Sequence, residues 1–168
     1  MKKILLFALL AWCLGTADAG NVSIIPQPVS VVEKSGQFKL ERDMVLSYEK
    51  GLEQYAEYLQ GIISRSTGWD LKLVADKKKA DIVLKTSPAE ITHKEGYRLD
   101  VSRSGVTVCG ADEAGVFYGI QSLLQLFPAQ IYSEKRCKDI EWTAPAVSVY
   151  DAPERPWRGM MLDVARYF

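Results

Sequence analysis

Apolar and polar residues alternate with a period of two between residues 97 and 109, which is typical of strands with one buried face. Tyr97, Leu99 and Val101 alternate with polar neighbours, and a second alternating run begins at Val106. The two runs are joined by Ser102-Arg103-Ser104-Gly105, a sequence that favours a turn. The pattern therefore predicts a hairpin in a sheet with one apolar and one polar face.

A helix is predicted directly after this hairpin. Gly110 breaks the second strand, and the Asp112 side chain can cap the first free amide groups of a helix. The nearly continuous apolar run then reaches Phe127 and stops before Pro128. We expect a mostly buried helix over residues 112–127.

Small residues form one stripe of this predicted helix, at Gly115, Gly119 and Ser122. A glycine inside a helix costs about 1 kcal/mol relative to alanine. Such a cost is compensated where the helix axis must lie close to a neighbouring element. The stripe therefore predicts close packing of this helix on the sheet, a core role without chemistry.

The preceding part of the chain predicts strands and one more helix. Short alternating runs indicate strands at 29–33, 37–40, 45–48, 71–73 and 82–84. Gly36 and Asp43 mark turns between the first three. One helical face is formed by Leu52, Tyr55, Ala56, Leu59, Ile62 and Ile63. Gly68 is placed to end that helix.

Two more strands are expected near the end of the chain, at 140–142 and 146–150. Runs of strands combined with two helices are typical of the α+β class. We therefore expect an α+β domain with a mixed, largely antiparallel sheet and both helices on its apolar face.

The first 19 residues have the features of a secretory signal peptide. Lys2 and Lys3 precede an apolar stretch at residues 4–14, and Ala17-Asp18-Ala19 matches a cleavage site. The expected product starts at Gly20 and is secreted or periplasmic. Cys13 allows a lipoprotein alternative, which bulky Trp12 before it disfavours. No later segment is long and apolar enough to be predicted as a transmembrane helix.

Charge and cysteine content exclude few classes of protein but lower the chance of nucleic-acid binding. Residues 20–168 contain 19 basic and 20 acidic side chains, so the net charge is near −1. This length supports one hydrophobic core. Cys109 and Cys137 remain after processing, and the sequence leaves open whether they pair in an oxidising compartment.

Motifs for catalysis, metal binding and cofactor binding are absent from the sequence. His93 is the only histidine and has no cysteine or carboxylate partners at ligand spacing. There is no HExxH motif, P-loop, nucleophile elbow or dinucleotide fingerprint. The run 77–79 of three lysines is interpreted as a solvated loop. We therefore predict no catalytic residue, no metal ligand and no cofactor in this chain.

The last twelve residues differ from an ordinary chain end. The segment from Trp157 to Phe168 reads WRGMMLDVARYF, rich in large apolar residues and without a closing turn. Such composition is typical of a strand buried on both faces. We therefore expect residues 152–168 to be the start of a second domain.

In order along the chain, these motifs resemble secreted β-N-acetylhexosaminidases of glycoside hydrolase family 20. The resemblance rests on IIPQPV, EGYRLDV, GVTVCGADEAGVFYGIQSLLQLF and PERPWRGMMLDVARYF. The O-linked N-acetylglucosaminidases have a similar leading domain and rank second. The resemblance implies an accessory domain over residues 20–151 and, from Arg158, the first strand of a truncated (β/α)₈ barrel.

The resemblance also implies one substrate-binding residue, Arg166. The arginine at this place in the motif binds hydroxyls of the terminal sugar, and a guanidinium has donors for two adjacent hydroxyls. Asp163 would support the strand and the arginine. Tyr167 departs from the histidine that usually follows. The partners implied for the full-length enzyme are N-acetylhexosamine-terminated glycans.

In this family the acetamido oxygen of the sugar attacks the anomeric carbon while a glutamic acid protonates the leaving oxygen, an exception to the two-carboxylate scheme. The resemblance places this acid and its aspartate partner after Phe168, so the chain alone is expected to be inactive. The alternative is a non-catalytic secreted carbohydrate-binding or scaffolding module. Trp69, Trp142 and Trp157 are too scattered in sequence to predict a stacking platform.

Overall fold

The computed structural model describes residues 22–77 and 79–161. In chain order its elements are β1 (Ser30–Lys39), β2 (Val45–Tyr48), α1 (Glu53–Thr67), β3 (Lys72–Ala75), β4 (Ile82–Thr86), β5 (Tyr97–Ser102), β6 (Gly105–Gly110), α2 (Glu113–Leu126), the 3₁₀ helix η1 (Ala129–Tyr132) and β7 (Thr143–Asp151). The strands form one seven-stranded sheet in the order β1-β7-β5-β6-β4-β2-β3.

The sheet is mixed, as expected, but it is not largely antiparallel. The pairs β1–β7, β5–β6 and β5–β7 are antiparallel, whereas β2–β3, β2–β4 and β4–β6 are parallel. The physical reason is a crossover. After β2 the chain runs back through α1, so that β3 lies beside β2 in the same direction.

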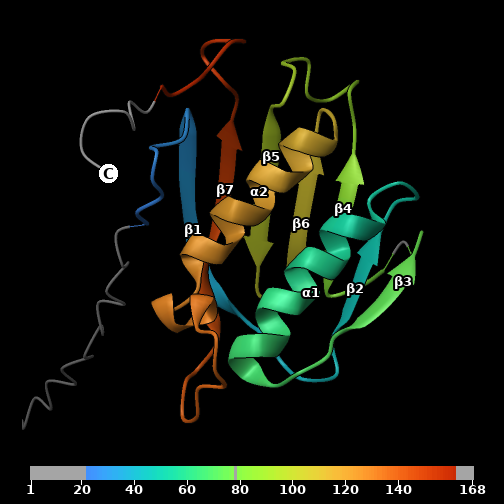
Figure 1. Ribbon diagram of the computed structural model, residues 1–168, viewed down its shortest axis with the longest axis vertical. Helices are drawn as coiled ribbons and strands as arrows, with labels where there is room; N and C mark the ends of the chain where they lie inside the picture. The colour runs from blue at the N-terminus through green and yellow to red at the C-terminus, as the bar shows by residue number, and fades with distance from the viewer. Residues whose placement is uncertain (1–21, 78, 162–168) are drawn as a thin grey trace, which may run out of the picture.

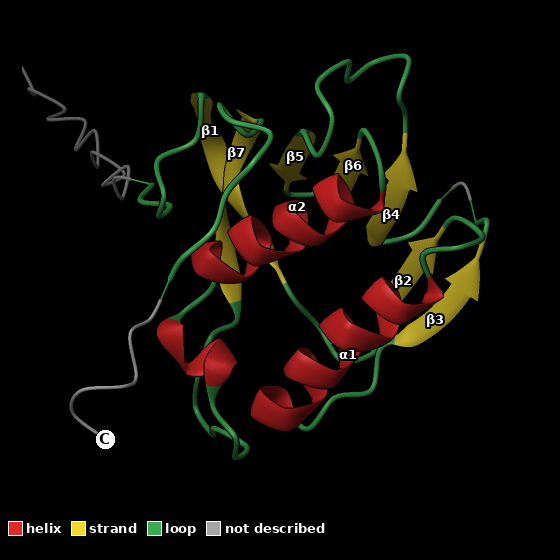
Figure 2. Ribbon diagram, turned by 45° about the horizontal axis from the view of Figure 1, so that its top comes forward, coloured by secondary structure: helices red, strands yellow, loops and turns green. Residues whose placement is uncertain are grey.

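Both helices pack on the same face of the sheet, as the sequence predicts (Figures 1 and 2). α2 lies over β5 and β6, and α1 lies nearer to β2 and β3. The core between these layers consists of fully buried side chains that include Leu46, Leu59, Leu84, Leu99, Val108, Ile120, Leu123 and Val149. This apolar burial is the main source of stability in a domain of this size.

The cap and the small-residue stripe of α2 are confirmed. The Asp112 side chain accepts a hydrogen bond from the Gly115 amide at 2.9 Å. A Cβ atom at Gly115 would overlap the carbonyl oxygen of Gly96, and one at Gly119 would lie 2.5 Å from Val108 Cγ1. The glycines therefore let the helix backbone approach the sheet directly.

A buried hydrogen bond completes the same contact between α2 and the sheet. The Tyr97 hydroxyl and Ser122 Oγ are 2.5 Å apart, and both residues are buried. Because the two hydroxyls satisfy each other, the polar ends of these side chains can be buried without an orphaned group.

α1 ends as the sequence predicts. Gly68 has φ of 73°, in the left-handed region, and its amide donates to the carbonyl of Ser64. This geometry satisfies one of the free carbonyls at the helix end. The arginine side chain of Arg136 packs over the glycine where a Cβ would stand.

The expected strands need correction at two places. The strands expected at 29–33 and 37–40 are one strand, β1, with an irregularity between Glu33 and Gln37. Gly36 has φ of 101° there, so the backbone bulges without leaving the sheet. The expected strand 140–142 does not form, and β7 starts at Thr143. Trp142 is instead buried in the core, and Asp139 before it has φ of 61°.

The two cysteines of the described chain do not pair. Both thiols are free, Cys109 buried and Cys137 partly buried. Burial raises the pKa of the Cys109 thiol, which makes it less reactive. Among the described helices, none has the length and apolar character needed to cross a bilayer.

Candidate functional site

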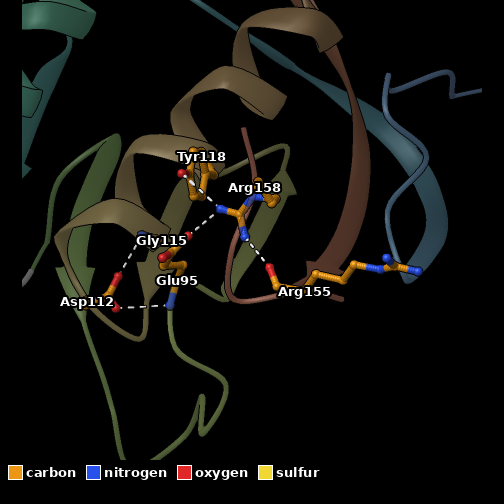
Figure 3. Close-up of polar contacts among 6 residues, drawn as sticks. All are labelled: Glu95, Asp112, Gly115, Tyr118, Arg155 and Arg158. Carbon is orange, nitrogen blue, oxygen red and sulfur yellow. Dashed lines mark hydrogen bonds and ion pairs between the residues drawn. The ribbon is translucent and has the colours of Figure 1, made fainter. Parts of the chain in front are cut away.

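Arg158 lies in the segment that follows β7, and its polar contacts connect this segment to the rest of the domain (Figure 3). Arg158 Nη2 donates to Glu95 Oε2 at 2.5 Å and lies 3.4 Å from the Tyr118 hydroxyl. Arg158 Nη1 donates to the carbonyl of Arg155 at 2.8 Å. One guanidinium thus joins the segment after β7 to the loop before β5 and to α2.

Glu95 is held in place by the cap of α2. Its backbone has φ of 62°, and its amide donates to Asp112 Oδ2 at 3.0 Å. The other carboxylate oxygen of Asp112 accepts from Gly115. The same aspartate therefore starts the helix and orients Glu95, as Figure 3 shows.

The electrostatics of this contact favour a charged guanidinium. The hydrogen bond to Glu95, followed by that to Tyr118, raises the pKa of Arg158. The Arg158 side chain is 45% exposed and that of Glu95 is 21% exposed. An ion pair so open to water adds little to stability, so its main effect is to fix the position of the segment that carries Arg158.

Four aromatic side chains gather on the two helices, and one of them, Tyr118, contacts Arg158. We call them the aromatic ridge: Tyr55 and Tyr58 of α1, Phe117 and Tyr118 of α2. The Phe117 ring centroid lies 5.6 Å from that of Tyr58, 6.3 Å from that of Tyr55 and 6.0 Å from that of Tyr118. These are ordinary distances for packed aromatic rings.

Phe117, at the centre of the aromatic ridge, lies away from the sheet, whereas Tyr55 and Tyr118 also pack against the core. Phe117 is two residues after Gly115, which places it on the opposite side of α2 from the glycine stripe. Tyr58 is 40% exposed, and its hydroxyl accepts from Gln121 Nε2 at 3.1 Å. The ridge therefore offers an apolar surface with hydroxyl groups on it, suited to packing against another protein surface or a sugar ring.

The described residues offer little for acid–base, nucleophilic or metal chemistry. Within residues 22–77 and 79–161 no group of three or more potential metal ligands occurs. His93 is exposed, and its Nδ1 lies 3.1 Å from the Tyr150 hydroxyl. Asp151 accepts from the Val29 amide and Glu154 is exposed.

A hollow of about 400 Å³ lies beside β2 and β4. Its lining combines Glu49 and Asp76 with Lys77 and Lys85, so its charges are mixed. Ser47 Oγ donates to the Lys77 carbonyl and accepts from the Lys77 amide. Ser47 and the Lys77 backbone are therefore satisfied by each other, and the described residues that line the hollow form no built site for an anion.

The site residues predicted from the sequence fall outside the described part of the chain. Arg166, Asp163 and Tyr167 lie outside the described residues. Trp157 is 83% exposed, whereas Trp142 is buried and the third tryptophan is partly buried. These three tryptophans therefore do not share one exposed surface.

Sequence reasoning missed the aromatic ridge. It placed Tyr55 on the core face of α1, where Tyr55 does pack against the core although it is only partly buried. It gave no sign that Phe117 of α2 would contact Tyr55 and Tyr58 of α1. A signal was present in α2, which is apolar nearly all round. Such a helix is typically covered on every side, and the sheet covers only one side.

Comparisons with known proteins identify the family. A family model described as glycosyl hydrolase family 20, domain 2, matches residues 21–152. The chain is 42% identical over 154 residues to a β-hexosaminidase of Vibrio vulnificus, covering 90% of this chain and 16% of that protein. It is 30% identical over 151 residues to one of Porphyromonas gingivalis, covering 88% of this chain and 19% of that protein.

Solved structures show the same fold. A GH20 β-N-acetylhexosaminidase from Streptomyces coelicolor A3(2) matches with a TM-score of 0.77 and 30% identity, covering 86% of this chain and 29% of that one. A mutant Streptomyces plicatus β-hexosaminidase in complex with its product, GlcNAc, matches with a TM-score of 0.73 and 26% identity, covering 80% of this chain and 27% of that one.

The chain therefore spans less than a third of the length of these relatives. It corresponds to the part of them that the family model describes as domain 2, and the seven-stranded sheet with its two helices is the fold of that domain. On these grounds the chain belongs to glycosyl hydrolase family 20.

Proposed function

We propose that this chain is the leading part of a secreted, exo-acting β-N-acetylhexosaminidase that removes terminal β-linked N-acetylhexosamine from glycans. The observation that carries the proposal is the match of residues 21–152 to domain 2 of the family. The proposed organisation is a signal peptide at 1–19, an accessory domain at 20–151 and the start of a (β/α)₈ catalytic domain at 152–168.

The proposed role of the described domain is to support the barrel that follows it. The aromatic ridge supplies a partly exposed apolar surface on the two helices. Trp157, Met160 and Met161 are between 83% and 94% exposed in the segment after β7. Large apolar side chains that are exposed together are typical of interaction surfaces, and a packed barrel would cover these.

Arg166 is the proposed substrate ligand in the full-length enzyme. It lies near the end of the proposed first barrel strand, and barrel active sites lie at the carboxyl ends of their strands. Its guanidinium would donate to adjacent hydroxyls of the terminal sugar. The acid that protonates the leaving oxygen and the aspartate that orients the acetamide would come from later strands.

The test compares the chain as given with a chain extended through the downstream reading frame. We expect the extended chain, and not residues 20–168, to release 4-nitrophenol from 4-nitrophenyl N-acetyl-β-glucosaminide. Arg166→Ala in the extended chain should lower kcat/KM by roughly 10- to 150-fold, the range for a lost hydrogen bond to a charged group. The exposed Arg155, changed to alanine, is the matched control.

Two outcomes would contradict the proposal. Release of 4-nitrophenol by residues 20–168 would show that the acid is not missing from this chain. An extended chain that folds but has no activity would remove the enzyme assignment. Secretion is tested separately by determining the amino terminus of the exported product, which should be Gly20.

The aromatic ridge also supports the second candidate, a non-catalytic carbohydrate-binding module. Its rings present apolar faces with nearby hydroxyls, a combination that suits a sugar. Titration of the chain with N-acetylglucosamine oligomers distinguishes the two candidates. Saturable binding that Tyr58→Ala abolishes would favour the module, and no binding would favour the barrel-supporting domain.

A further inference from the structure

We propose that Glu95 and Arg158 form a latch that sets where, and in which direction, the segment after β7 leaves the domain. The latch is defined by the Glu95 carboxylate, the Arg158 guanidinium and the Tyr118 hydroxyl (Figure 3). Its consequence for the following domain rests on the proposed function. The existence of the latch rests only on the contacts of the described residues.

The first argument is that Glu95 is a fixed point. Its amide donates to Asp112, and the next residue, Gly96, donates to the carbonyl of His93 at 2.9 Å and accepts from Ala111 at 2.8 Å. Gly96 also lies against Gly115, with no room for a Cβ between them. The loop that carries the carboxylate is therefore tied to the start of α2 at several atoms.

The second argument is that the segment after β7 makes few other hydrogen bonds to the domain besides those of Arg158. β7 ends at Asp151. Of the described residues from 153 to 161, only Arg158 hydrogen-bonds through its side chain to the helices or loops of the domain. Its bond to the Arg155 carbonyl also closes a turn within the segment. Releasing this one guanidinium would remove the side-chain hydrogen bonds that hold the described part of this segment to the domain.

The third argument is the direction that the latch imposes. Tyr118 is both a contact of Arg158 and a member of the aromatic ridge, since its ring centroid lies 6.0 Å from that of Phe117. The segment is thus fixed at the end of the ridge, on the helix side of the domain. Whatever follows Arg158 starts beside the surface that we propose it covers. Arg158 is a positioning residue in this scheme.

The test uses trypsin on the chain as it exists. The bond between Arg158 and Gly159 can be cut only when the guanidinium leaves Glu95 and enters the protease. Glu95→Gln should increase the rate of cleavage there about two- to five-fold, the effect of losing a partly exposed ion pair. Cleavage between Lys135 and Arg136, in an exposed loop, is the reference that corrects for differences in protease activity between reactions.

Three comparisons sharpen the result. Glu90→Gln removes an exposed carboxylate from the same loop and should leave the rate unchanged. Tyr118→Phe keeps the ring, removes the hydroxyl and should increase the rate by less than Glu95→Gln does. About 1 M salt should bring the unsubstituted chain towards the Glu95→Gln rate, because salt screens exposed charges.

A positioning role gives a second readout in the extended chain. Glu95→Gln should raise KM for the aryl glycoside while kcat and the urea midpoint stay close to those of Glu90→Gln. Equal cleavage rates in Glu95→Gln and Glu90→Gln would overturn the latch. A confirmed latch in an extended chain without hexosaminidase activity would overturn the proposed function alone. Increased cleavage with an unchanged KM would show that the latch holds the segment but does not position the following domain.

Discussion

Individual residues decide several features of this domain through local chemistry. Asp112 caps α2 and Gly68 ends α1, as their sequence contexts predict. Both roles involve backbone groups within four residues, so they can be inferred without knowing the fold. The contact of Tyr97 with Ser122 is different, because 25 residues separate them and only the packing of α2 on β5 brings them together.

Tyr97 should make stability depend on pH in the alkaline range. Burial raises the pKa of the Tyr97 phenol above its ordinary 10.0, the hydrogen bond with Ser122 opposes the rise, and Asp151 adds to it. The unfolded chain therefore loses this proton first as the pH rises above about 10. The resulting stabilisation is complete below pH 10 and is lost as the pH rises through the higher pKa of the folded state.

The measurement is urea unfolding at several pH values between 9 and 11. The free energy of unfolding should fall less steeply with pH in Tyr97→Phe than in the unsubstituted chain. Tyr58→Phe, which removes a hydroxyl from the exposed surface, is the matched control. Identical slopes for the unsubstituted chain and Tyr97→Phe would contradict the burial of this phenol.

At the scale of elements, the packing of α2 on the sheet depends on its glycine stripe. Gly115 faces the carbonyl of Gly96, which is backbone and cannot rotate away. Gly61 of α1 is a useful contrast, because a Cβ there would meet only Arg65 Nη1 at 3.7 Å. The two glycines occupy the same kind of element and differ in the surface that they face.

Alanine at these two glycines should have effects of opposite sign. Gly115→Ala is expected to lower the free energy of unfolding by about 1–3 kcal/mol, because overpacking displaces the helix from the sheet. Gly61→Ala should raise it by roughly 0.5–1 kcal/mol through better helix propensity. Denaturant unfolding measures both, and a stabilising Gly115→Ala would show that α2 does not approach the sheet so closely.

The stripe shows how far a pattern can predict an element contact. Spacing alone indicated close approach by Gly115, Gly119 and Ser122, and the structure confirms it. The same kind of pattern failed for β1, which was expected as two strands. A glycine between two alternating runs is compatible with a turn or a bulge, and only pairing with β7 selects the bulge.

At the scale of the whole molecule, strand order separates a central region from two edges. β5 lies between β6 and β7 and is hydrogen-bonded on both sides, whereas β3 is a short edge strand beside β2. Leu99 and Val101 of β5 are fully buried, and the residues of β3 are partly buried or exposed. Local opening should therefore start at the β3 edge.

Native-state hydrogen exchange should show this order. After correction for intrinsic rates, amides of β5 should exchange at least about 100-fold more slowly than those of β3, since central strands open only with global unfolding. The comparison is internal to one molecule, so differences in stability between preparations do not affect it. Equal protection of β3 and β5 would contradict the sheet order found here.

The sequence by itself determined the two helices, most strands, the cap and helix-ending residues, and the motifs that place the chain in its family. Each of these depends on residues close together in the chain, where propensity, periodicity and capping act. Only the tertiary structure decided the parallel pairing of β2, the aromatic ridge and the contact of Glu95 with Arg158, 63 residues away. These features arise where distant segments are packed together, and no local preference encodes which surfaces will meet.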